Sequence, residues 1–214
     1  DLFCKCALNK DRVAIFGDYD CDGITSSAML KTLCSVFNLR CDVFIPSRFD
    51  HGYGLNPKSV DAFIKSFSTP PKLLICADCG SNSEEEILKF KEFGIEHIII
   101  IDHHIIDENK KSKSMDALVN WHLNEDSKEM CTTGECFQFI RGIRYLTKKV
   151  DPIQFLAYAA LGTLADISPI QGDNRIIVKN GLSREALNRM PYCGLTSLIE
   201  RANLDVDSIT QKDI

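Results

Sequence analysis

Short, continuous runs of apolar residues alternate along the chain with longer segments in which apolar residues recur at helical spacing. The continuous runs are typical of strands buried on both faces, and they lie at residues 12–17, 41–45, 73–77, 97–101 and, more briefly, 118–120. Helical spacing predicts helices at residues 23–38, 57–67, 84–93, 134–149 and 153–165. Strands and helices in this order predict an α/β fold, in which helices flank both faces of a mostly parallel, Rossmann-like sheet.

Several of these helices carry residues that favour starting or stopping a helix. Ser83 and Glu86 have the spacing of a capping box, and Gly94 stands where the same helix should end. Asp151 and Pro152 suit the start of the last predicted helix. These signals define both expected ends of the helix at 84–93 and the expected start of the helix at 153–165.

Polar segments suggest how the chain is divided. Residues 107–114 are charged or small and predict a solvent-exposed connection, and the chain becomes polar again from about residue 190. The length of 214 residues fits one α/β domain with a short appendage. We therefore expect a core domain over residues 1–190, followed at 191–214 by a tail or the start of a linker.

Composition places the protein among soluble globular chains. Hydrophobic residues make up 44% and charged residues 26% of the sequence, and no apolar run is long enough to span a bilayer or act as a signal peptide. The ten cysteines are scattered and favour free thiols in a reducing compartment, so we expect a cytoplasmic protein without a membrane partner. The net charge of -5 does not indicate a nucleic-acid surface, although a local basic stripe or bound cations can override the average.

Acidic residues stand directly after three of the predicted strands. They are Asp18, Asp20 and Asp22; Asp78; and Asp102, which two histidines follow, His103 and His104. Asp166 ends the last predicted helix. The carboxyl ends of parallel strands share one edge of the sheet, where open α/β folds bind their ligands, so we expect these side chains to meet.

A cluster of five or six carboxylates needs bound cations. Two unit charges about 4 Å apart repel by roughly 4 kcal/mol at an effective dielectric near 20. Two divalent ions about 3.5–4 Å apart would offset that charge and are the usual device for attack on a phosphorus centre. Oxygen ligands with one or two imidazoles favour Mn²⁺, with Mg²⁺ as its physiological competitor.

Each acid also has a structural interpretation. Asp78 or Asp166 taken alone would most simply cap a helix, and a DxDxD sequence is often a calcium-like loop or a turn. The calcium-loop signature is incomplete here, because the twelfth position counted from Asp18 is Met29 rather than glutamate. The occurrence of four acidic sites at predicted element ends favours a metal centre.

Four motifs resemble the DHH phosphoesterase superfamily and stand in the order of that family. They are GDYDCDGITSS at 17–27, CADCGSN at 76–82, IDHH at 101–104 and GTLADISPIQGDNR at 162–175. Two further segments resemble more closely the catalytic core of the RecJ single-strand-specific exonucleases, namely IPSRFDHGYGLN at 45–56 and TGECFQFIRG at 133–142. The resemblance extends over about residues 12–182.

The resemblance implies two metal ions, Mn²⁺ or Mg²⁺. The implied ligands of the first ion are Asp18, Asp20 and Asp78. Those of the second ion are Asp22, Asp78, His103 and Asp166. Asp78 would therefore bridge the ions, His104 would face the scissile phosphate, and Asp102 would orient the histidines. A water shared by the ions would attack phosphorus and release a sugar hydroxyl.

Four residues are candidates for substrate contacts, each with a structural alternative. Arg48 and Tyr53 could present a guanidinium and an aromatic face to a nucleotide, or form a rigid loop with a packed tyrosine. Ser26 could donate to phosphate, or cap the helix that it begins. Arg175, next to Asn174, could contact phosphate or belong to a structural pair.

The leading functional hypothesis from the resemblance is a metal-dependent 5′ to 3′ exonuclease on single-stranded DNA, with a place in DNA repair and recombination. A DHH enzyme for oligoribonucleotides or 3′-phosphoadenosine phosphate is one alternative, and a catalytically weak replication factor is another. The DHH-associated domain that follows the core in RecJ proteins has no counterpart in the sequence. Together with Asp1 at the first position, this favours a fragment, or a partner that supplies the substrate grip.

Overall fold

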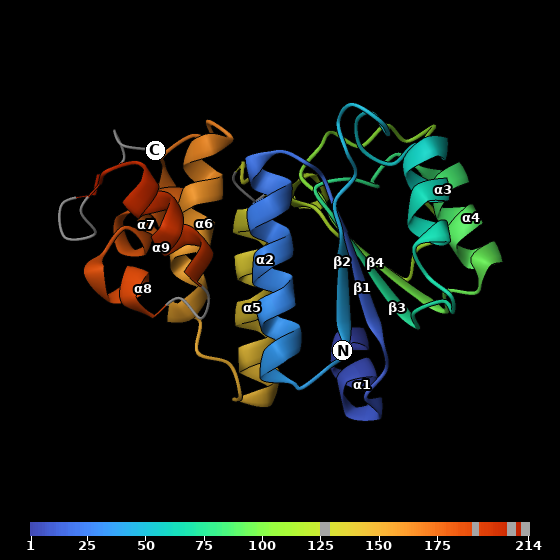
Figure 1. The fold of residues 1–214 in the computed structure, drawn as a ribbon, viewed down its shortest axis with the longest axis horizontal. Helices are drawn as coiled ribbons and strands as arrows, with labels where there is room; N and C mark the ends of the chain where they lie inside the picture. Colours follow the sequence, from blue (N-terminus) through green and yellow to red (C-terminus); the bar gives the residue numbers. More distant parts are fainter. Residues whose placement is uncertain (125–128, 190–192, 205–208, 211–214) are drawn as a thin grey trace.

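The computed structural model describes residues 1–124, 129–189, 193–204 and 209–210. Its centre is a five-stranded parallel sheet with the strand order β2-β1-β3-β4-β5 (Figure 1). The strands are β1 (Val13–Gly17), β2 (Cys41–Phe44), β3 (Leu73–Ala77), β4 (His97–Ile101) and β5 (Ala117–Val119). Gly17 pairs with Ala77, and Ala77 pairs with Ile101. The loops after β1, β3 and β4 therefore leave from one edge.

Helices cover both faces of the sheet and add a further layer on one side (Figure 1). Those next to the sheet are α1 (Leu2–Asn9), α2 (Cys21–Val36), α3 (Pro57–Lys65), α4 (Glu84–Phe93) and α5 (Thr132–Thr147). A short 3₁₀ helix, η1 (Trp121–Leu123), follows β5. The further layer contains α6 (Ile153–Ala165), α7 (Gly172–Gly181), α8 (Arg184–Asn188) and α9 (Cys193–Arg201). In it, α6 packs against both α2 and α5.

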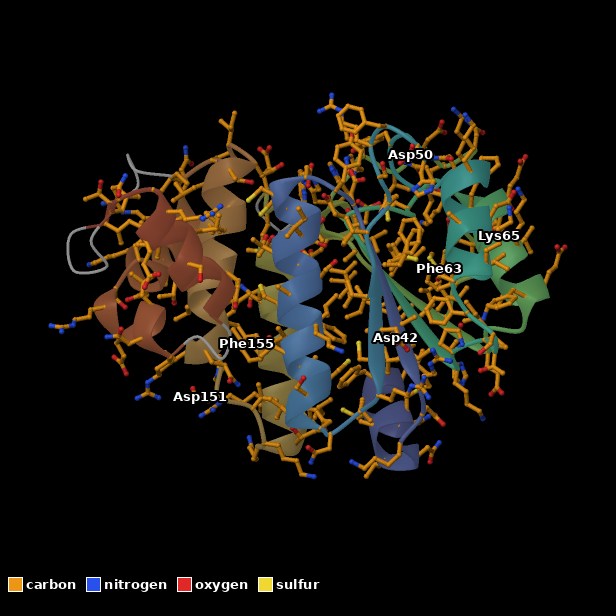
Figure 2. The ribbon with its side chains drawn as sticks, viewed as in Figure 1. Asp42, Asp50, Phe63, Lys65, Asp151 and Phe155 are labelled. Carbon is orange, nitrogen blue, oxygen red and sulfur yellow. The ribbon has the colours of Figure 1, made fainter. Side chains whose placement is uncertain are left out.

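Each face of the sheet has its own hydrophobic core. Val13 and Ile15 of β1 pack with side chains of α1, α2 and α5, whereas Phe16, on the other face, packs with α3 and α4. Figure 2 shows Phe63 of α3 in the second core and Phe155 of α6 among the helices on the opposite side of the sheet. Burial on both faces explains why the strands are continuous rather than alternating apolar runs.

The predicted strands and helices are confirmed, with ends displaced by no more than two residues. Gly94 ends α4 in the left-handed conformation, with φ 108°. The side chain of Asp151 accepts a hydrogen bond from the backbone of Ile153 at the start of α6. The all-parallel sheet flanked by helices is the predicted α/β architecture.

One predicted local feature is wrong, and another holds only in part. The side chain of Ser83 makes no capping hydrogen bond; instead its backbone N–H donates to the hydroxyl of Ser112 over 3.1 Å. Residues 107–114 are not simply a solvated connection, because Ser112 is fully buried and its hydroxyl donates to the carbonyl of Gly80. The hydroxyl of Ser112 thus takes the place of the predicted capping box and fixes the polar segment to the start of α4.

The helices of the further layer are the least anticipated part of the fold. The apolar spacing does not predict α7, α8 or α9, and α1 at the other end of the chain is also unpredicted. Residues 193–201 fall in the segment expected to be a tail or the start of a linker, and they form α9. Ile199 of this helix packs with Ala157 and Leu187. Packed structure therefore continues past residue 190.

The helix lengths and the cysteines bear on two further predictions, those about membrane spans and disulfides. Among the described residues, no helix combines the length and apolar character needed to cross a bilayer. The described cysteine thiols are free, as predicted, and most of them are buried.

Candidate metal centre

The first acidic loop joins β1 to α2. Asp20 caps α2 by accepting a hydrogen bond from the backbone N–H of Gly23 at 2.9 Å, and Asp22 lies in the first turn of the helix. Gly23 packs so closely on the backbone of Asp18 that a side chain there would collide with it. This tight turn buries Asp18 and Asp22 and leaves Asp20 exposed.

Asp78 and Asp102 begin the loops after β3 and β4. The backbone N–H of Asp78 donates to the carbonyl of Ile101, and that of Asp102 donates to Val119, so each loop starts as an extension of the sheet. Asp78 then adopts a left-handed backbone, with φ 66°, a conformation that aspartate tolerates better than most residues. The sheet itself therefore positions both carboxylates, which are buried.

Side chains from these loops and from the end of α6 converge at the sheet edge. In the described part of the chain, three groups of candidate ligand atoms lie within 4.8 Å of one another: Asp18, Asp20 and Asp78; Asp22, His103 and Asp166; and Asp78, His103 and His104. Nε2 of His103 is 3.5 Å from Asp78 and 4.0 Å from an oxygen of both Asp22 and Asp166. The predicted meeting of acids distant in the sequence is confirmed.

The start of α5 donates hydrogen bonds to two of these acids. Asp22 accepts hydrogen bonds from the backbone N–H groups of Thr132 and Thr133, at 2.7 and 2.8 Å, and from the Thr133 hydroxyl. The hydroxyl of Thr132 donates to Asp78 at 3.0 Å. The first turn of α5 therefore fixes one carboxylate from each of two loops.

Asp18 has no such support. Both of its carboxylate oxygens are buried and make no hydrogen bond of ordinary geometry with the described residues, although the nearby backbone N–H groups of Tyr19 and Gly54 partly offset the effect of burial on its pKa. A buried, unpaired carboxylate is costly unless a cation lies beside it. Carboxylate oxygens with one or two imidazole nitrogens are also the ligands that Mn²⁺ and Mg²⁺ accept. The residues present therefore fit a divalent cation, and the cluster could bind metal.

The electrostatics of the cluster lead to the same conclusion. Burial, together with the charges of Asp22, Asp20 and Asp102, raises the pKa of Asp78 to about 11. Burial also raises the pKa of Asp18, and that of Asp22 despite the hydrogen bonds from Thr133. These carboxyl groups favour the ionised state only when a positive charge is nearby, which is what a bound divalent ion provides.

His104 is held between two side chains at the rim of the centre. Its Nδ1 is 2.7 Å from Asp102, and its Nε2 is 2.9 Å from the hydroxyl of Tyr53. The hydrogen bond to Asp102 raises the pKa of His104, although burial opposes the shift. Burial also opposes ionisation of Asp102, yet the hydrogen bond and charge of His104 hold its pKa below the ordinary value. The two residues therefore form a charge-assisted pair.

An aromatic surface adjoins this pair. Tyr53 is 57% exposed, its ring centre is 6.0 Å from that of Tyr19, and it lines a cavity of about 210 Å³ together with His104. The guanidinium of Arg48 lies 5.5 Å from the ring centre of Tyr19. Phe49, which the sequence argument does not include, is 96% exposed. Arg48 and Tyr53 are thus grouped on the open side of the centre.

The other two predicted substrate contacts lie elsewhere. Ser26 is fully buried, with its hydroxyl 3.1 Å from that of Thr133, so a substrate cannot reach it in this structure. Arg175 is exposed on α7, where it lines a different cavity together with Lys179 and Leu182. Ser26 is linked to the acidic cluster only through Thr133, whose hydroxyl also donates to Asp22, and Arg175 does not line the cavity that contains Tyr53 and His104.

Three residues that support the metal centre are not among the residues predicted from the sequence, namely Thr132, Thr133 and Asn120. The amide of Asn120 donates to the carbonyl of His104 at 2.9 Å and to the hydroxyl of Ser81 at 3.2 Å. Its position directly after a strand was an available signal. Thr133 begins one of the segments that resemble RecJ cores, but nothing in the sequence links either threonine to acids that are 54 and 110 or more positions away.

Comparison with known proteins adds an independent line of evidence. Residues 12–163 match the family model described as "DHH family, N-terminal domain". The chain belongs to the DHH family. The matched residues include the loops after β1, β3 and β4 and the start of α5, which together build most of the centre of this DHH chain.

The DHH chain also resembles individual exonucleases. The single-stranded-DNA-specific exonuclease RecJ of Haemophilus influenzae is 32% identical over 225 residues, which cover 96% of this chain and 37% of that protein. RecJ of Thermus thermophilus is 32% identical over 190 residues, covering 88% of this chain and 27% of that protein. A crystal structure of exonuclease RecJ bound to manganese matches with a TM-score of 0.83 at 27% identity, over 96% of this chain and 51% of that one. The chain thus spans well under half the length of these two curated relatives.

Proposed function

We propose that this DHH chain is the catalytic core of a metal-dependent phosphodiesterase that degrades single-stranded DNA as a 5′ to 3′ exonuclease. The observation that carries the proposal is the convergence of carboxylates and a histidine from four separate segments, with buried Asp18 oxygens that lack partners. Similarity to proteins named single-stranded-DNA-specific exonucleases supports the choice of substrate. A role in cytoplasmic DNA repair or recombination, with a partner or further domain that grips the DNA, belongs to the same proposal.

Two groups of side chains are suited to two ions, for which we favour Mn²⁺ over Mg²⁺. The first group is Asp18, Asp20 and Asp78. The second group is Asp22, His103 and Asp166, with Asp78 shared because His103 lies 3.5 Å from it. Bound divalent ions would supply an activated water and would neutralise charge on the phosphate oxygens.

We assign His104 to the scissile phosphate rather than to an ion. Both ring nitrogens already have partners in Asp102 and Tyr53, so the ring is oriented without a metal. Its raised pKa favours the protonated form, which can donate a hydrogen bond or a proton to a phosphate or leaving oxygen. Asp102 holds the orientation and stabilises the charge of the ring.

The aromatic surface is suited to an unpaired strand. Bases that are free of a duplex can stack on Tyr53 or Tyr19, and Arg48 can approach a phosphate beside them. The chain carries a net charge of -5, so bound cations and local groups such as Arg48 must attract the phosphate backbone. Recognition would therefore depend on stacking as well as on charge.

The proposal is tested with one set of labelled oligonucleotides. With Mn²⁺, we expect digestion of a 5′-labelled single strand to release labelled mononucleotide first, whereas a blunt duplex should persist and EDTA should stop the reaction. A 3′-labelled copy of the same strand checks the polarity. Preference for a dinucleotide would favour the short-substrate enzyme instead. Mn²⁺ binding without any cleavage would favour a catalytically weak replication factor.

A further inference from the structure

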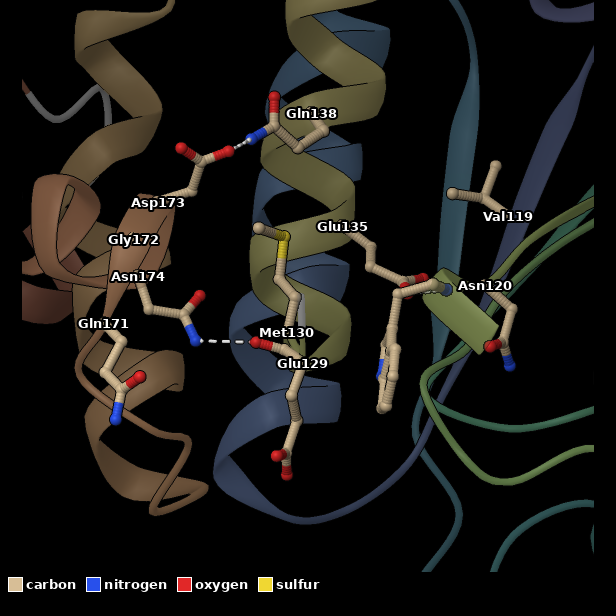
Figure 3. A pocket seen from close by; sticks show the side chains of 11 residues that line it. Val119, Asn120, Glu129, Met130, Glu135, Gln138, Gln171, Gly172, Asp173 and Asn174 are labelled. Carbon is tan, nitrogen blue, oxygen red and sulfur yellow. Dashed lines mark hydrogen bonds between the residues drawn. The ribbon is translucent and has the colours of Figure 1, made fainter. Parts of the chain in front are cut away.

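A second polar cavity lies beside the metal centre and has no part in the proposed function. It has a volume of about 510 Å³ and is enclosed by β5, η1 and the starts of α5 and α7 (Figure 3). We call it the Trp121 cavity; the lining residues that matter here are Trp121, Glu129, Glu135, Asp173 and Asn174. Figure 3 shows that Glu135 and Asn174 come from opposite walls, α5 and α7.

Three buried polar atoms at the Trp121 cavity have no hydrogen-bond partner among the described residues: Oε2 of Glu135, Oδ1 of Asn174 and Nε1 of Trp121. Glu135 is 4% exposed and Asn174 is 2% exposed. An unsatisfied buried polar group costs about 1–3 kcal/mol, so three at one cavity indicate a ligand that would satisfy them.

The two acceptor side chains cannot turn away to find other partners. Oε1 of Glu135 accepts the backbone N–H of Trp121 at 2.6 Å. The amide nitrogen of Asn174 donates to the carbonyls of Glu129 and Pro169, at 2.9 and 3.0 Å. The remaining oxygen of each side chain is therefore held in place as a buried, unpaired acceptor, and a ligand reaches it through a local shift of the residues that line the cavity.

The charge of the residues that line the Trp121 cavity restricts the class of ligand that it can bind. Among the described lining residues, the ionisable side chains are Glu129, Glu135 and Asp173, and none is lysine, arginine or histidine. Such a wall repels phosphate and carboxylate groups and attracts a cation. Burial raises the pKa of Glu135 to about 9, and a cation beside its free oxygen would offset that cost.

A guanidinium satisfies these conditions better than an ammonium ion. It is planar and always charged, and its five N–H donors have a fixed arrangement that matches a carboxylate. The indole N–H of Trp121 additionally needs an acceptor, which a peptide carbonyl provides. Free arginine fits less well, because the acidic wall would repel its carboxylate.

We propose that the Trp121 cavity binds an arginine side chain presented by a peptide segment of a partner protein. The guanidinium donates to Oε2 of Glu135, a peptide N–H of the same segment donates to Oδ1 of Asn174 on the opposite wall, and a peptide carbonyl accepts from Nε1 of Trp121. Two segments connect the Trp121 cavity to the metal centre. Asn120, which donates to His104, directly precedes Trp121. Glu135 lies one helical turn after Thr132, which donates to Asp78. A partner bound here would sit beside the proposed exonuclease centre.

The chain contains a built-in reporter for this test, since Trp121 is its single tryptophan. Titration with Nα-acetyl-arginine amide should change the tryptophan fluorescence in a saturable way. The neutral isostere Nα-acetyl-citrulline amide should bind at least about tenfold more weakly, because it lacks the charge. Free arginine should also bind more weakly, and deoxyadenosine should give no saturable change.

Glu135→Gln is the decisive variant. Glutamine keeps an oxygen for the backbone N–H of Trp121 but places an NH₂ group where the guanidinium would sit. We expect a loss of at least about tenfold in affinity for the arginine amide, with an unchanged circular dichroism spectrum. Glu85→Gln, on the exposed side of α4, is the matched control and should bind normally. Equal binding of arginine and citrulline amides, normal binding by Glu135→Gln, or saturable binding of the nucleoside alone would overturn the proposal.

Discussion

The metal centre and the Trp121 cavity lie near the same helix start, that of α5, and both bury carboxylates, but they differ in the number of acids that meet. At the metal centre Asp78 lies among several other carboxylates, so only a highly charged ion can balance them. In the Trp121 cavity Glu135 is the one buried carboxylate among the lining residues that the structure describes, and a monovalent group is sufficient. The number of converging acids, more than the burial of any one, therefore decides what charge a site can hold.

The largest expected effect comes from Asp78→Asn. Asparagine tolerates the left-handed backbone of this position but removes the shared charge. We expect DNA digestion with Mn²⁺ to fall by on the order of 10³-fold. In EDTA the variant should resist urea better than the wild type, because burial and neighbouring acids raise the pKa of Asp78 to about 11. Asp61→Asn, on the exposed side of α3, should change neither quantity, and a normal rate in Asp78→Asn would refute its assignment as a shared ligand.

His104→Ala separates chemistry from metal binding. The ring is held by Asp102 and Tyr53, so its removal should slow single-turnover cleavage by about 10²-fold and leave Mn²⁺ affinity in calorimetry nearly unchanged. His103→Ala is the matched comparison and should weaken Mn²⁺ binding. Since His104 also lies within 4.8 Å of Asp78 and His103, a large loss of affinity in His104→Ala would identify it as a ligand.

Thr132→Val tests how far the start of α5 organises the metal centre. The isosteric change removes the hydroxyl that donates to Asp78 while keeping the backbone N–H that donates to Asp22. We expect Mn²⁺ affinity to fall by roughly tenfold, the low end for residues that support metal ligands. Thr147→Val, at the other end of α5, removes a hydroxyl whose hydrogen bonds are to the backbone groups of Ile143 and Lys149, and it should leave the affinity unchanged.

These supports show where sequence reasoning succeeds and where it fails. The strands carry their own signal, because burial on both faces requires a continuous apolar run such as 97–101. Once the strands are known, parallel pairing places Asp18, Asp78 and Asp102 at one edge, so the acidic cluster could be predicted. Thr132 could not, because its role depends on the packing of α5 against loops far away in the sequence.

Glu135 illustrates a second limit. In the sequence it lies in the RecJ-like segment 133–142, near the start of an amphipathic helix, and only the packing of β5, η1 and α7 around it reveals a buried carboxyl. The helices α7 to α9 are short and partly polar, so their apolar spacing is weak and α7, which forms one wall of the cavity, is not predicted. The Trp121 cavity is therefore visible only in three dimensions.

The smallest expected effect is on stability and again concerns Glu135. The pKa of this carboxyl is about 9 in the folded protein, against an ordinary value of 4.5. Below pH 4.5 both states hold the proton and stability is greatest; as the pH rises towards 9, the unfolded state releases the proton more readily, so wild-type stability falls. Glu135→Gln does not titrate and should gain about 1–3 kcal/mol over the wild type between pH 5.5 and pH 8.5, measured from urea midpoints.

The control for this gain is Glu85→Gln, which should follow the wild type at both pH values because position 85 is exposed. A Glu135→Gln difference that stays constant with pH would mean that the carboxyl is already ionised at pH 5.5, and the contrast with the metal centre would disappear. Nα-acetyl-arginine amide adds a further comparison. If its guanidinium stabilises the ionised carboxylate, saturating ligand should narrow the gap between wild type and variant at pH 8.5, whereas Mn²⁺ should leave that gap unchanged.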